Sequence, residues 1–227
     1  MNIKISKSEG DYLKAIYHLT QQEEITNTVA LSEMLNVKPP SVTSMLNKLL
    51  HQEPALVEYK KWRGVKLTDS GKRLALQLLR RHRLIEQFLV EKLNYTWEEV
   101  HEEAEELEHV ISEKFEEHLS VLLGDPQFDP HGDPIPDRDL NFPNSDTLSL
   151  TDLVVDQAAI VRRVNINQSD LLRYLSEQGI VPGAKIQIQN RNPYDETLQL
   201  SVGDEKSAYA LGPEISKLIF VEKITDI

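Results

Sequence analysis

A stretch of closely spaced histidines and glutamates, residues 82–109, constrains this chain more than any other feature of its sequence. Spacings of three and four residues link His101, Glu105, Glu108 and His109. On a helix, such spacings place the four side chains within about a third of the circumference. The neighbouring arc of the same helix is apolar and consists of Ala104, Leu107, Ile111 and Phe115. Imidazoles and carboxylates at the edge of a buried face are costly unless something binds them.

A divalent cation would remove this cost, because imidazole and carboxylate together suit Mn, Fe, Co, Ni or Zn. His82 and Glu86, four residues apart, could add ligands from an earlier helix. The chain has no cysteine, which excludes disulfides, thiolate metal sites and cysteine nucleophiles. Position 105 is Glu, so neither the HExxH metalloprotease motif nor its inverted form is present. The alternative is a solvated acidic helix that binds no metal.

The net charge of -12 is distributed unevenly along the 227 residues. Residues 1–81 carry thirteen Lys and Arg against eight Asp and Glu, whereas residues 82–147 carry four against eighteen. Only the first third can meet phosphate favourably, because salt screens charges beyond about 10 Å. The acidic middle third is either a cation site or a solubilising face.

Hydropathy and the first residues of the chain indicate where the protein resides. The chain has no run of about 18 apolar residues, so we expect no membrane span and no membrane partner. Its first residues, Met1-Asn2-Ile3-Lys4, lack the apolar segment of a secretory signal. We therefore expect a cytoplasmic protein.

The basic first third has the pattern of a DNA-binding domain. Residues 6–20 predict a helix with Ser8 as its N-cap. Residues 28–35 and 40–50 predict two short helices separated by a break at 36–39, which is the helix-turn-helix pattern. Because any helical hairpin looks similar, this segment alone leaves DNA binding and a plain hairpin both open.

A basic hairpin follows and strengthens the DNA-binding interpretation. Residues 56–68 alternate as two strands around a tip near Arg63-Gly64, which predicts a winged helix-turn-helix. The alternative is a solvated cationic hairpin. The residues expected to contact DNA are Lys38, Pro40, Ser41, Thr43, Ser44 and Lys48 on the helices, and Lys60, Lys61 and Arg63 on the wing.

The rest of the chain predicts three further segments. Helices at 69–93, carrying His82 and Glu86, and at 97–122, capped by Thr96, are expected to pack a dimer that presents two heads to a palindromic site. Residues 124–146 are rich in Pro, Asp and Gly and predict an extended linker, in which His131 could be a ligand but is expected to be solvated. A small β-barrel is predicted from strands at 159–164, 185–189, 198–202 and 218–224, with one helix at 168–178.

This order of segments resembles the diphtheria-toxin-repressor family of metal-dependent transcriptional repressors. The most specific pieces are His82–Glu86, Val100–His109 and Pro130–Pro136. The C-terminal part, including Gly179–Gly183, is similar to the SH3-like domain shared with ferrous-iron-transport A proteins. The fold implied is mainly α, a winged helix-turn-helix plus a helical dimerisation domain, with a small C-terminal all-β SH3-like barrel. The implied divisions are a DNA-binding domain at 1–72, a metal-binding and dimerisation domain at 73–124, a linker at 125–147 and an SH3-like domain at 148–227.

The resemblance implies two adjacent metal sites in each subunit. One would use His82, Glu86 and His101, and the other, the regulatory site, Asp11, Glu105, Glu108 and His109. Gln168 or Asp170 in the third domain could donate a further ligand. Iron-sensing members carry Met where this chain has Asp11 and Cys where it has Glu105, whereas the manganese branch carries carboxylates at both positions. Lys14, where that branch often has Glu, cannot be a ligand while it is charged.

The expected function is therefore that of a metal-activated repressor of metal-uptake genes, a homodimer on double-stranded palindromic operator DNA and not an enzyme. Mn²⁺ is the expected cofactor because hard oxygen ligands suit it, with Fe²⁺, Co²⁺ or Zn²⁺ possible in vitro. Three alternatives are an Fe²⁺-responsive repressor of the same fold, a metal-independent DNA-binding protein with an acidic dimer face, and a metallohydrolase. The metallohydrolase lacks a convincing base or nucleophile motif.

Overall fold

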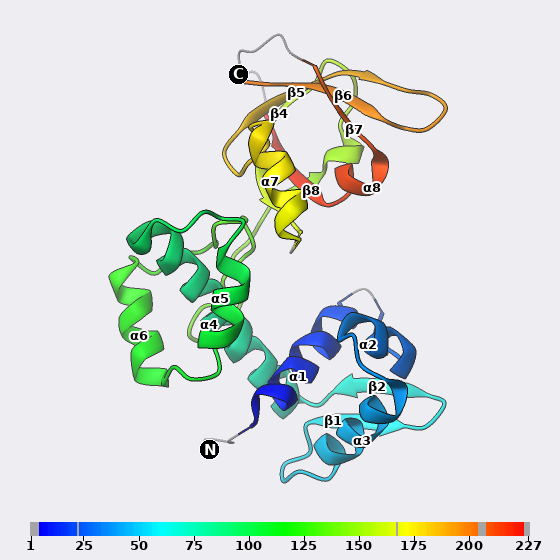
Figure 1. Ribbon diagram of the computed structural model, residues 1–227, viewed down its shortest axis with the longest axis vertical. Coiled ribbons are helices and arrows are strands. Elements are labelled where there is room, and N and C mark those ends of the chain that lie inside the picture. The colour runs from blue at the N-terminus through cyan, green and yellow to red at the C-terminus, as the bar shows by residue number, and fades with distance from the viewer. Residues whose placement is uncertain (1–4, 22, 167, 204–207, 225–227) are drawn as a thin grey trace. The chain divides into compact units, whose positions relative to one another are not determined.

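A computed structural model describes residues 5–21, 23–166, 168–203 and 208–224 (Figure 1). The chain forms two compact units. The first unit contains Met1–His82, Glu105–Glu116 and Pro136–Asn141, and the second contains Arg83–Ala104, Glu117–Ile135 and Phe142–Ile227. Among the described residues, no helix is long and apolar enough to cross a membrane.

The first unit begins with α1 (Lys7–Leu19), which lies within the predicted range of 6–20. Its N-cap is Ser6, not Ser8: the Ser6 hydroxyl accepts the Glu9 backbone N–H at 3.4 Å, and Glu9 Oε2 accepts the Ser6 N–H at 2.7 Å. This reciprocal capping box satisfies two of the free donors at the helix start. Tyr12, Leu13 and Ile16 form the buried face of α1.

The predicted helix-turn-helix and wing are both present in the first unit (Figure 1). Helix α2 (Thr28–Met34) is capped by Asn27, and α3 (Pro39–Leu50) has proline in its first turn, where the missing N–H is not needed. Strands β1 (Val57–Lys60) and β2 (Gly64–Leu67) pair antiparallel as the wing. The apolar faces of these elements share one core with α1.

The predicted long helix is confirmed as α4 (Asp69–Leu93), but the predicted single helix at 97–122 is wrong. It is two helices, α5 (Val100–Leu107) and α6 (Glu113–Leu122). The Ser112 hydroxyl accepts the Phe115 backbone N–H at 3.2 Å and thereby caps the new helix. The continuous apolar arc expected to reach Phe115 does not exist, since this side chain is about half exposed.

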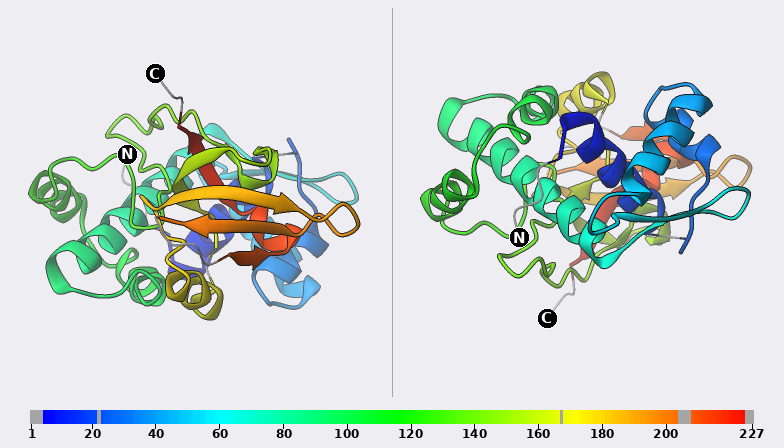
Figure 2. Two further views of the ribbon diagram at one scale, coloured as in Figure 1. Left: turned by 90° about the horizontal axis from the view of Figure 1, so that it is seen from above. Right: turned by 90° about the horizontal axis from the view of Figure 1, so that it is seen from below.

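The second unit ends in a six-stranded antiparallel sheet with the order β3-β8-β4-β5-β6-β7. Its strands are β3 (Leu148–Ser149), β4 (Ala158–Val164), β5 (Lys185–Arg191), β6 (Leu198–Val202), β7 (Tyr209–Leu211) and β8 (Ile219–Lys223). Figure 2 shows β5 and β6 running beside each other as the long orange strands. The predicted short helix is α7 (Ser169–Glu177), and a 3₁₀ turn (Leu150–Asp152) and α8 (Pro213–Ser216) were not predicted.

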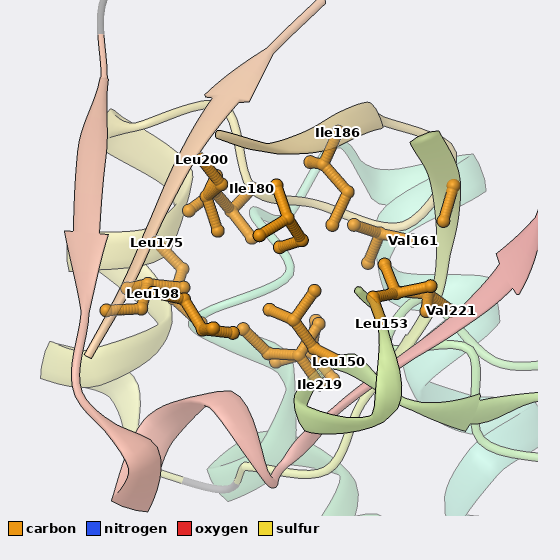
Figure 3. Packing of buried hydrophobic residues seen from close by; sticks show 14 of the residues in the cluster. Leu150, Leu153, Val161, Leu175, Ile180, Ile186, Leu198, Leu200, Ile219 and Val221 are labelled. Carbon is orange, nitrogen blue, oxygen red and sulfur yellow. The ribbon is translucent and has the colours of Figure 1, made fainter. Parts of the chain in front are cut away.

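One face of this sheet is buried in an aliphatic core (Figure 3). Inward positions alternate along the strands, as in Ile186 and Ile188 of β5, and Leu172 and Leu175 of α7 pack into the same cluster. The domain is therefore not all-β, because helices contribute to its core. It is an antiparallel sheet domain whose described strand order ends at β3 and β7.

The Pro-, Asp- and Gly-rich segment 124–146 contains no helix or strand, as predicted, although Phe128 and Pro134 form an isolated bridge. The expectation of a solvated His131 is wrong, because this residue is 5% exposed. Gly132 has φ +82, and a Cβ there would lie 1.8 Å from the Arg162 carbonyl oxygen. Only glycine allows this turn to pack so closely on β4, and the close packing buries its neighbours.

Candidate metal centres

The four predicted regulatory ligands come together in the first unit. We call Asp11, Glu105, Glu108 and His109 the Asp11 cluster. One ligand atom from each residue lies within 4.8 Å of the others. His109 Nε2 is 3.0 Å from Asp11 Oδ1 and 3.1 Å from Glu108 Oε1. The cluster therefore joins α1, which carries Asp11, to the end of α5 and the turn that follows it.

Close approach of α1 to this cluster depends on Gly10. A Cβ on Gly10 would lie 2.8 Å from both His109 Cε1 and Leu78 Cδ1. Such a separation is too short for real contacts, so any larger side chain would push α1 away from the histidine. The glycine before Asp11 thus allows the carboxylate to reach its partners.

Lys14, one turn after Asp11 on α1, supplies a positive charge to the same cluster. Its Nζ lies 2.7 Å from Glu105 Oε1 and 2.5 Å from Glu108 Oε1. Burial disfavours the charged form of Lys14, but the charges of Glu108 and Glu105 outweigh it and raise the lysine pKa above its usual value. Lys14 therefore stays cationic and balances the two glutamates.

Glu108 is the fully buried member of the Asp11 cluster. Its Oε2 lies 2.7 Å from His82 Nδ1 on α4. Among the described residues, its Oε1 has charged neighbours but no hydrogen-bond partner in good geometry. The Lys14 ammonium at 2.5 Å compensates the charge of this buried oxygen, so a bound metal ion would compete with Lys14 for it. Three carboxylates and one imidazole also form a donor set that suits a divalent cation, so these residues fit a metal ion.

The second unit holds a further group that sequence analysis missed. We call Glu86, Asp129 and His131 the Glu86 cluster; their ligand atoms also lie within 4.8 Å of one another, and all three residues are buried. His131 Nδ1 is 3.8 Å from Glu86 Oε2 and 3.9 Å from Asp129 Oδ1. The Asp-x-His spacing was visible in the sequence, but the surrounding prolines and glycines indicated a solvated linker.

Local hydrogen bonds fix the geometry of the Glu86 cluster. Asp129 Oδ1 accepts backbone N–H groups from His131 at 2.8 Å and Asp133 at 2.9 Å. His131 Nε2 donates to the Trp97 carbonyl oxygen at 2.7 Å, which leaves Nδ1 directed towards the carboxylates. A histidine held through one nitrogen presents the other in a fixed direction, as metal-binding histidines do.

Burial and charge shift the pKa values of this cluster. Burial, followed by the nearby charges of Glu86 and Asp133, raises the pKa of Asp129 well above its usual range. Burial lowers the pKa of His131, but its hydrogen bond and charge interaction with Glu86 outweigh burial and raise that pKa to about 9. His131 therefore carries a positive charge beside the buried carboxylates, and Arg83 supplies another, with its Nε 3.6 Å from Asp129 Oδ2.

The other predicted ligands belong to neither of the two clusters, apart from Glu86. His101 Nδ1 lies 3.3 Å from Glu86 Oε1 in the second unit, whereas His82 is the last residue of the first unit and contacts Glu108. The predicted set of His82, Glu86 and His101 remains a prediction. Gln168 is exposed, and Asp170 is exposed and pairs with Arg173 at 3.4 Å. These two also remain predictions and belong to neither cluster.

The predicted DNA-contacting residues lie on α3, at its N-cap and on the wing, all within the first unit. Thr43 is half-buried, and the exposed residues are Lys38, Pro40, Ser41, Ser44, Lys48, Lys60, Lys61 and Arg63. An exposed basic surface on a helix-turn-helix and its wing is suited to phosphate contacts.

Comparisons with known proteins match three successive parts of the chain. Residues 4–65 match the model of the iron dependent repressor N-terminal DNA binding domain. Residues 68–137 match the iron dependent repressor metal binding and dimerisation domain, and residues 148–223 match the FeoA domain. The diphtheria toxin repressor of Corynebacterium diphtheriae is 30% identical over 191 residues, covering 80% of this chain and 84% of that protein.

Two further relatives extend the likeness to nearly the full length. The iron-dependent repressor IdeR of Mycobacterium leprae is 29% identical over 225 residues, covering 94% of this chain and 96% of that protein. A solved structure described as a manganese-dependent transcriptional repressor complex with manganese is 33% identical, with a TM-score of 0.85, covering 95% of this chain and 100% of that chain.

Proposed function

This chain belongs to the iron-dependent repressor family, which includes the diphtheria toxin repressor, and on this premise we propose that Mn²⁺ is its activating metal. As a member, the chain is a metal-dependent transcriptional repressor with an N-terminal DNA-binding domain. The metallohydrolase alternative is excluded, because the members of this family are transcriptional repressors and not enzymes. The similar structure with manganese supports the choice of metal.

The observation that carries the proposal is the donor set of the Asp11 cluster. It offers three carboxylates and one imidazole within 4.8 Å, in a chain with no thiol. A set of hard oxygen donors favours Mn²⁺, whereas a set that contains cysteine favours softer ions. Fe²⁺ remains the second candidate, because several relatives are named iron-dependent, and Co²⁺ or Zn²⁺ could also occupy the site in vitro.

The Asp11 cluster is linked to the DNA-binding surface through α1. Bound Mn²⁺ would supply positive charge that holds the four ligands together. Asp11 lies on α1, and the neighbouring Tyr12, Leu13 and Ile16 share a core with Leu46 and Leu49 of α3. Metal held by Asp11 and His109 would thus strengthen a contact that already joins them at 3.0 Å, and would fix α1 and, through this core, the orientation of α3. By linkage, any gain in operator affinity from metal is matched by an equal gain in metal affinity from operator.

We propose a second centre with Glu86 as its shared ligand. Glu86 could be completed either by His82 and His101, as the resemblance implies, or by Asp129 and His131, as the buried Glu86 cluster suggests. Removal of one histidine from each set separates these alternatives. If His131→Ala lowers metal stoichiometry and His101→Ala does not, the Glu86 cluster is the second centre.

The wider organisation also belongs to this proposal. We propose domains at 1–72, 73–124 and 148–227 with a linker at 125–147. We also propose that the C-terminal sheet closes as an SH3-like barrel, and that the protein binds a palindromic operator of metal-uptake genes as a homodimer. The matched families are described as a DNA binding domain and as a metal binding and dimerisation domain, which supports the domain division and the homodimer on DNA. Phe115, Val121 and Leu122 leave an exposed apolar surface on α6 that suits a dimer contact.

Operator binding tests the proposal directly. A duplex is first selected from a palindromic DNA library with the full-length protein and Mn²⁺. Fluorescence anisotropy then measures its affinity with Mn²⁺, with Fe²⁺ under anaerobic conditions, and with EDTA. Binding with Mn²⁺ that is lost with EDTA is expected. Stronger activation by Fe²⁺ at equal free concentration would favour the iron-responsive alternative, and equal binding in EDTA would contradict the mechanism.

A further inference from the structure

Trp62 is placed in a way that neither the fold nor the metal centres explain. It lies between β1 and β2 at the tip of the wing, and 92% of it is exposed. Its backbone has φ 70, a left-handed conformation that large side chains rarely adopt. A single exposed apolar side chain needs no special explanation by itself, so the surroundings of this indole decide what it can contact.

The surroundings of Trp62 are cationic. Lys61 and Arg63 flank it in the sequence, and Lys61 Nζ lies 5.4 Å from the centre of the indole ring. Trp62 also lines a groove of about 690 Å³, whose other wall includes Thr28 and Val29 of α2 and Thr43 of α3. The groove therefore lies between the wing and the helix-turn-helix within the first unit.

This combination of charge and aromatic surface identifies the partner as double-stranded DNA. Cations around the ring attract a phosphate backbone, and the aromatic face offers an apolar contact that a solvated lysine cannot. When α3 lies in a major groove, a wing beside it reaches the adjacent backbone and minor groove, where apolar side chains can pack between or against bases.

We propose that Trp62 contacts the operator, with its indole packed into the minor groove next to the segment contacted by α3. This inference rests on the proposed function, because it requires the operator complex. It adds a contact that does not depend on charge to a wing otherwise described by its lysines and arginine. Trp62 thus contributes affinity that salt does not screen.

Tyr194 provides a matched control within the same chain. It is 96% exposed near the tip of the β5–β6 hairpin, so it resembles Trp62 in exposure and in its position on a hairpin. Its neighbours Asp195 and Glu196 are acidic and would repel phosphate. Because neither side chain packs in a core, alanine at either position should leave folding intact.

The test compares Trp62→Ala, Lys61→Ala and Tyr194→Ala in the full-length protein with Mn²⁺ and the selected operator duplex, over a series of salt concentrations. Trp62→Ala should weaken binding roughly tenfold, in line with aromatic–base contacts, without changing the slope of log affinity against log salt. Lys61→Ala should reduce the slope by about one for each subunit. Tyr194→Ala should change neither quantity.

Intrinsic fluorescence gives a second measurement. The chain has two tryptophans, so the difference between wild type and Trp62→Phe isolates the emission of Trp62. Operator binding should quench this difference signal. An affinity of Trp62→Ala within twofold of wild type, or a Trp62 signal unchanged by operator, overturns the inference and leaves the repressor function standing. Failure of wild type itself to bind the operator in a metal-dependent way overturns the proposed function and the inference with it.

Discussion

The Asp11 cluster and the Glu86 cluster use the same kinds of side chain but balance their negative charge differently. In the Asp11 cluster, Lys14 pairs with Glu105 and Glu108 and stays cationic. In the Glu86 cluster, His131 is a cation within the cluster, since its pKa is raised to about 9, and Arg83 lies 3.6 Å from Asp129. A lysine cannot act as a ligand while it is charged, whereas a histidine becomes one when its proton leaves.

The two clusters also differ in exposure. The side chains of Asp11 and Glu105 are about one-third exposed, whereas all three residues of the Glu86 cluster are buried. Ions can therefore exchange with solvent more readily at the Asp11 cluster. Because of this difference, we expect the Asp11 cluster to sense the metal concentration. We expect the buried Glu86 cluster to stabilise the surrounding fold.

His131→Ala should have the largest effect, because it removes the only member of the Glu86 cluster that can balance its carboxylates. His101 and Arg83 stay beside Glu86 and Asp129, at 3.3 and 3.6 Å, but the loss of the buried His131 should lower the free energy of unfolding by about 3 kcal/mol. Urea unfolding in EDTA measures the change. His118→Ala, on the exposed side of α6, is the control and should have little effect. Equal stability of both variants would show that His131 does not balance this charge.

Glu108→Gln should break the Asp11 cluster selectively. The substitution keeps the shape of the side chain but removes the buried charge between His82, His109 and Lys14. We expect Mn²⁺ affinity to fall about 100-fold, the size of effect seen when a metal site loses an important polar group. Isothermal titration calorimetry measures this change. Glu103→Gln, exposed on the same helix α5, should retain wild-type affinity; similar losses in both variants would exclude a specific role for Glu108.

Lys14→Met should sharpen the comparison by removing the fixed cation of the Asp11 cluster. Without a competing ammonium at Glu105 and Glu108, Mn²⁺ affinity should rise about tenfold, equivalent to about 1.4 kcal/mol. Lys7→Met is the matched control on α1, because Lys7 pairs with Glu106 only at the surface. A competition titration with a metal-binding dye measures both variants. A fall in affinity for Lys14→Met would mean that Lys14 organises the ligands and does not compete with metal.

Glu105→Cys should have the smallest effect, a several-fold change in metal preference without loss of the centre. A thiolate in place of a carboxylate favours softer ions, so affinity for Fe²⁺ or Co²⁺ should rise relative to Mn²⁺. The ratio of dissociation constants under anaerobic conditions measures the change. Glu106→Cys, exposed beside it, controls for adventitious thiol binding. An unchanged ratio would mean that Glu105 does not ligate the ion.

Local pattern was sufficient for much of the first unit. The apolar spacing of α1 and α3, the alternation of the wing and the length of α4 each depend on neighbours within a few residues. The ligand types of the Asp11 cluster were also identifiable, since helical spacing and resemblance together indicated Asp11, Glu105, Glu108 and His109. The break between α5 and α6 was not predicted, because Ser112 within a charged run did not stand out as a cap.

The sequence by itself thus determined the order of the segments, the winged helix-turn-helix and the kinds of side chain that meet in the Asp11 cluster. Only the tertiary structure decided that Lys14 pairs with Glu108 and that His131 is buried beside Glu86. These contacts join residues separated by 94 and 45 positions along the chain. Composition around His131 indicates a loop, but burial of a loop depends on what packs against it, here the close approach of Gly132 to Arg162. Periodicity reports which face of an element is apolar, whereas charge balance depends on groups that only folding brings together.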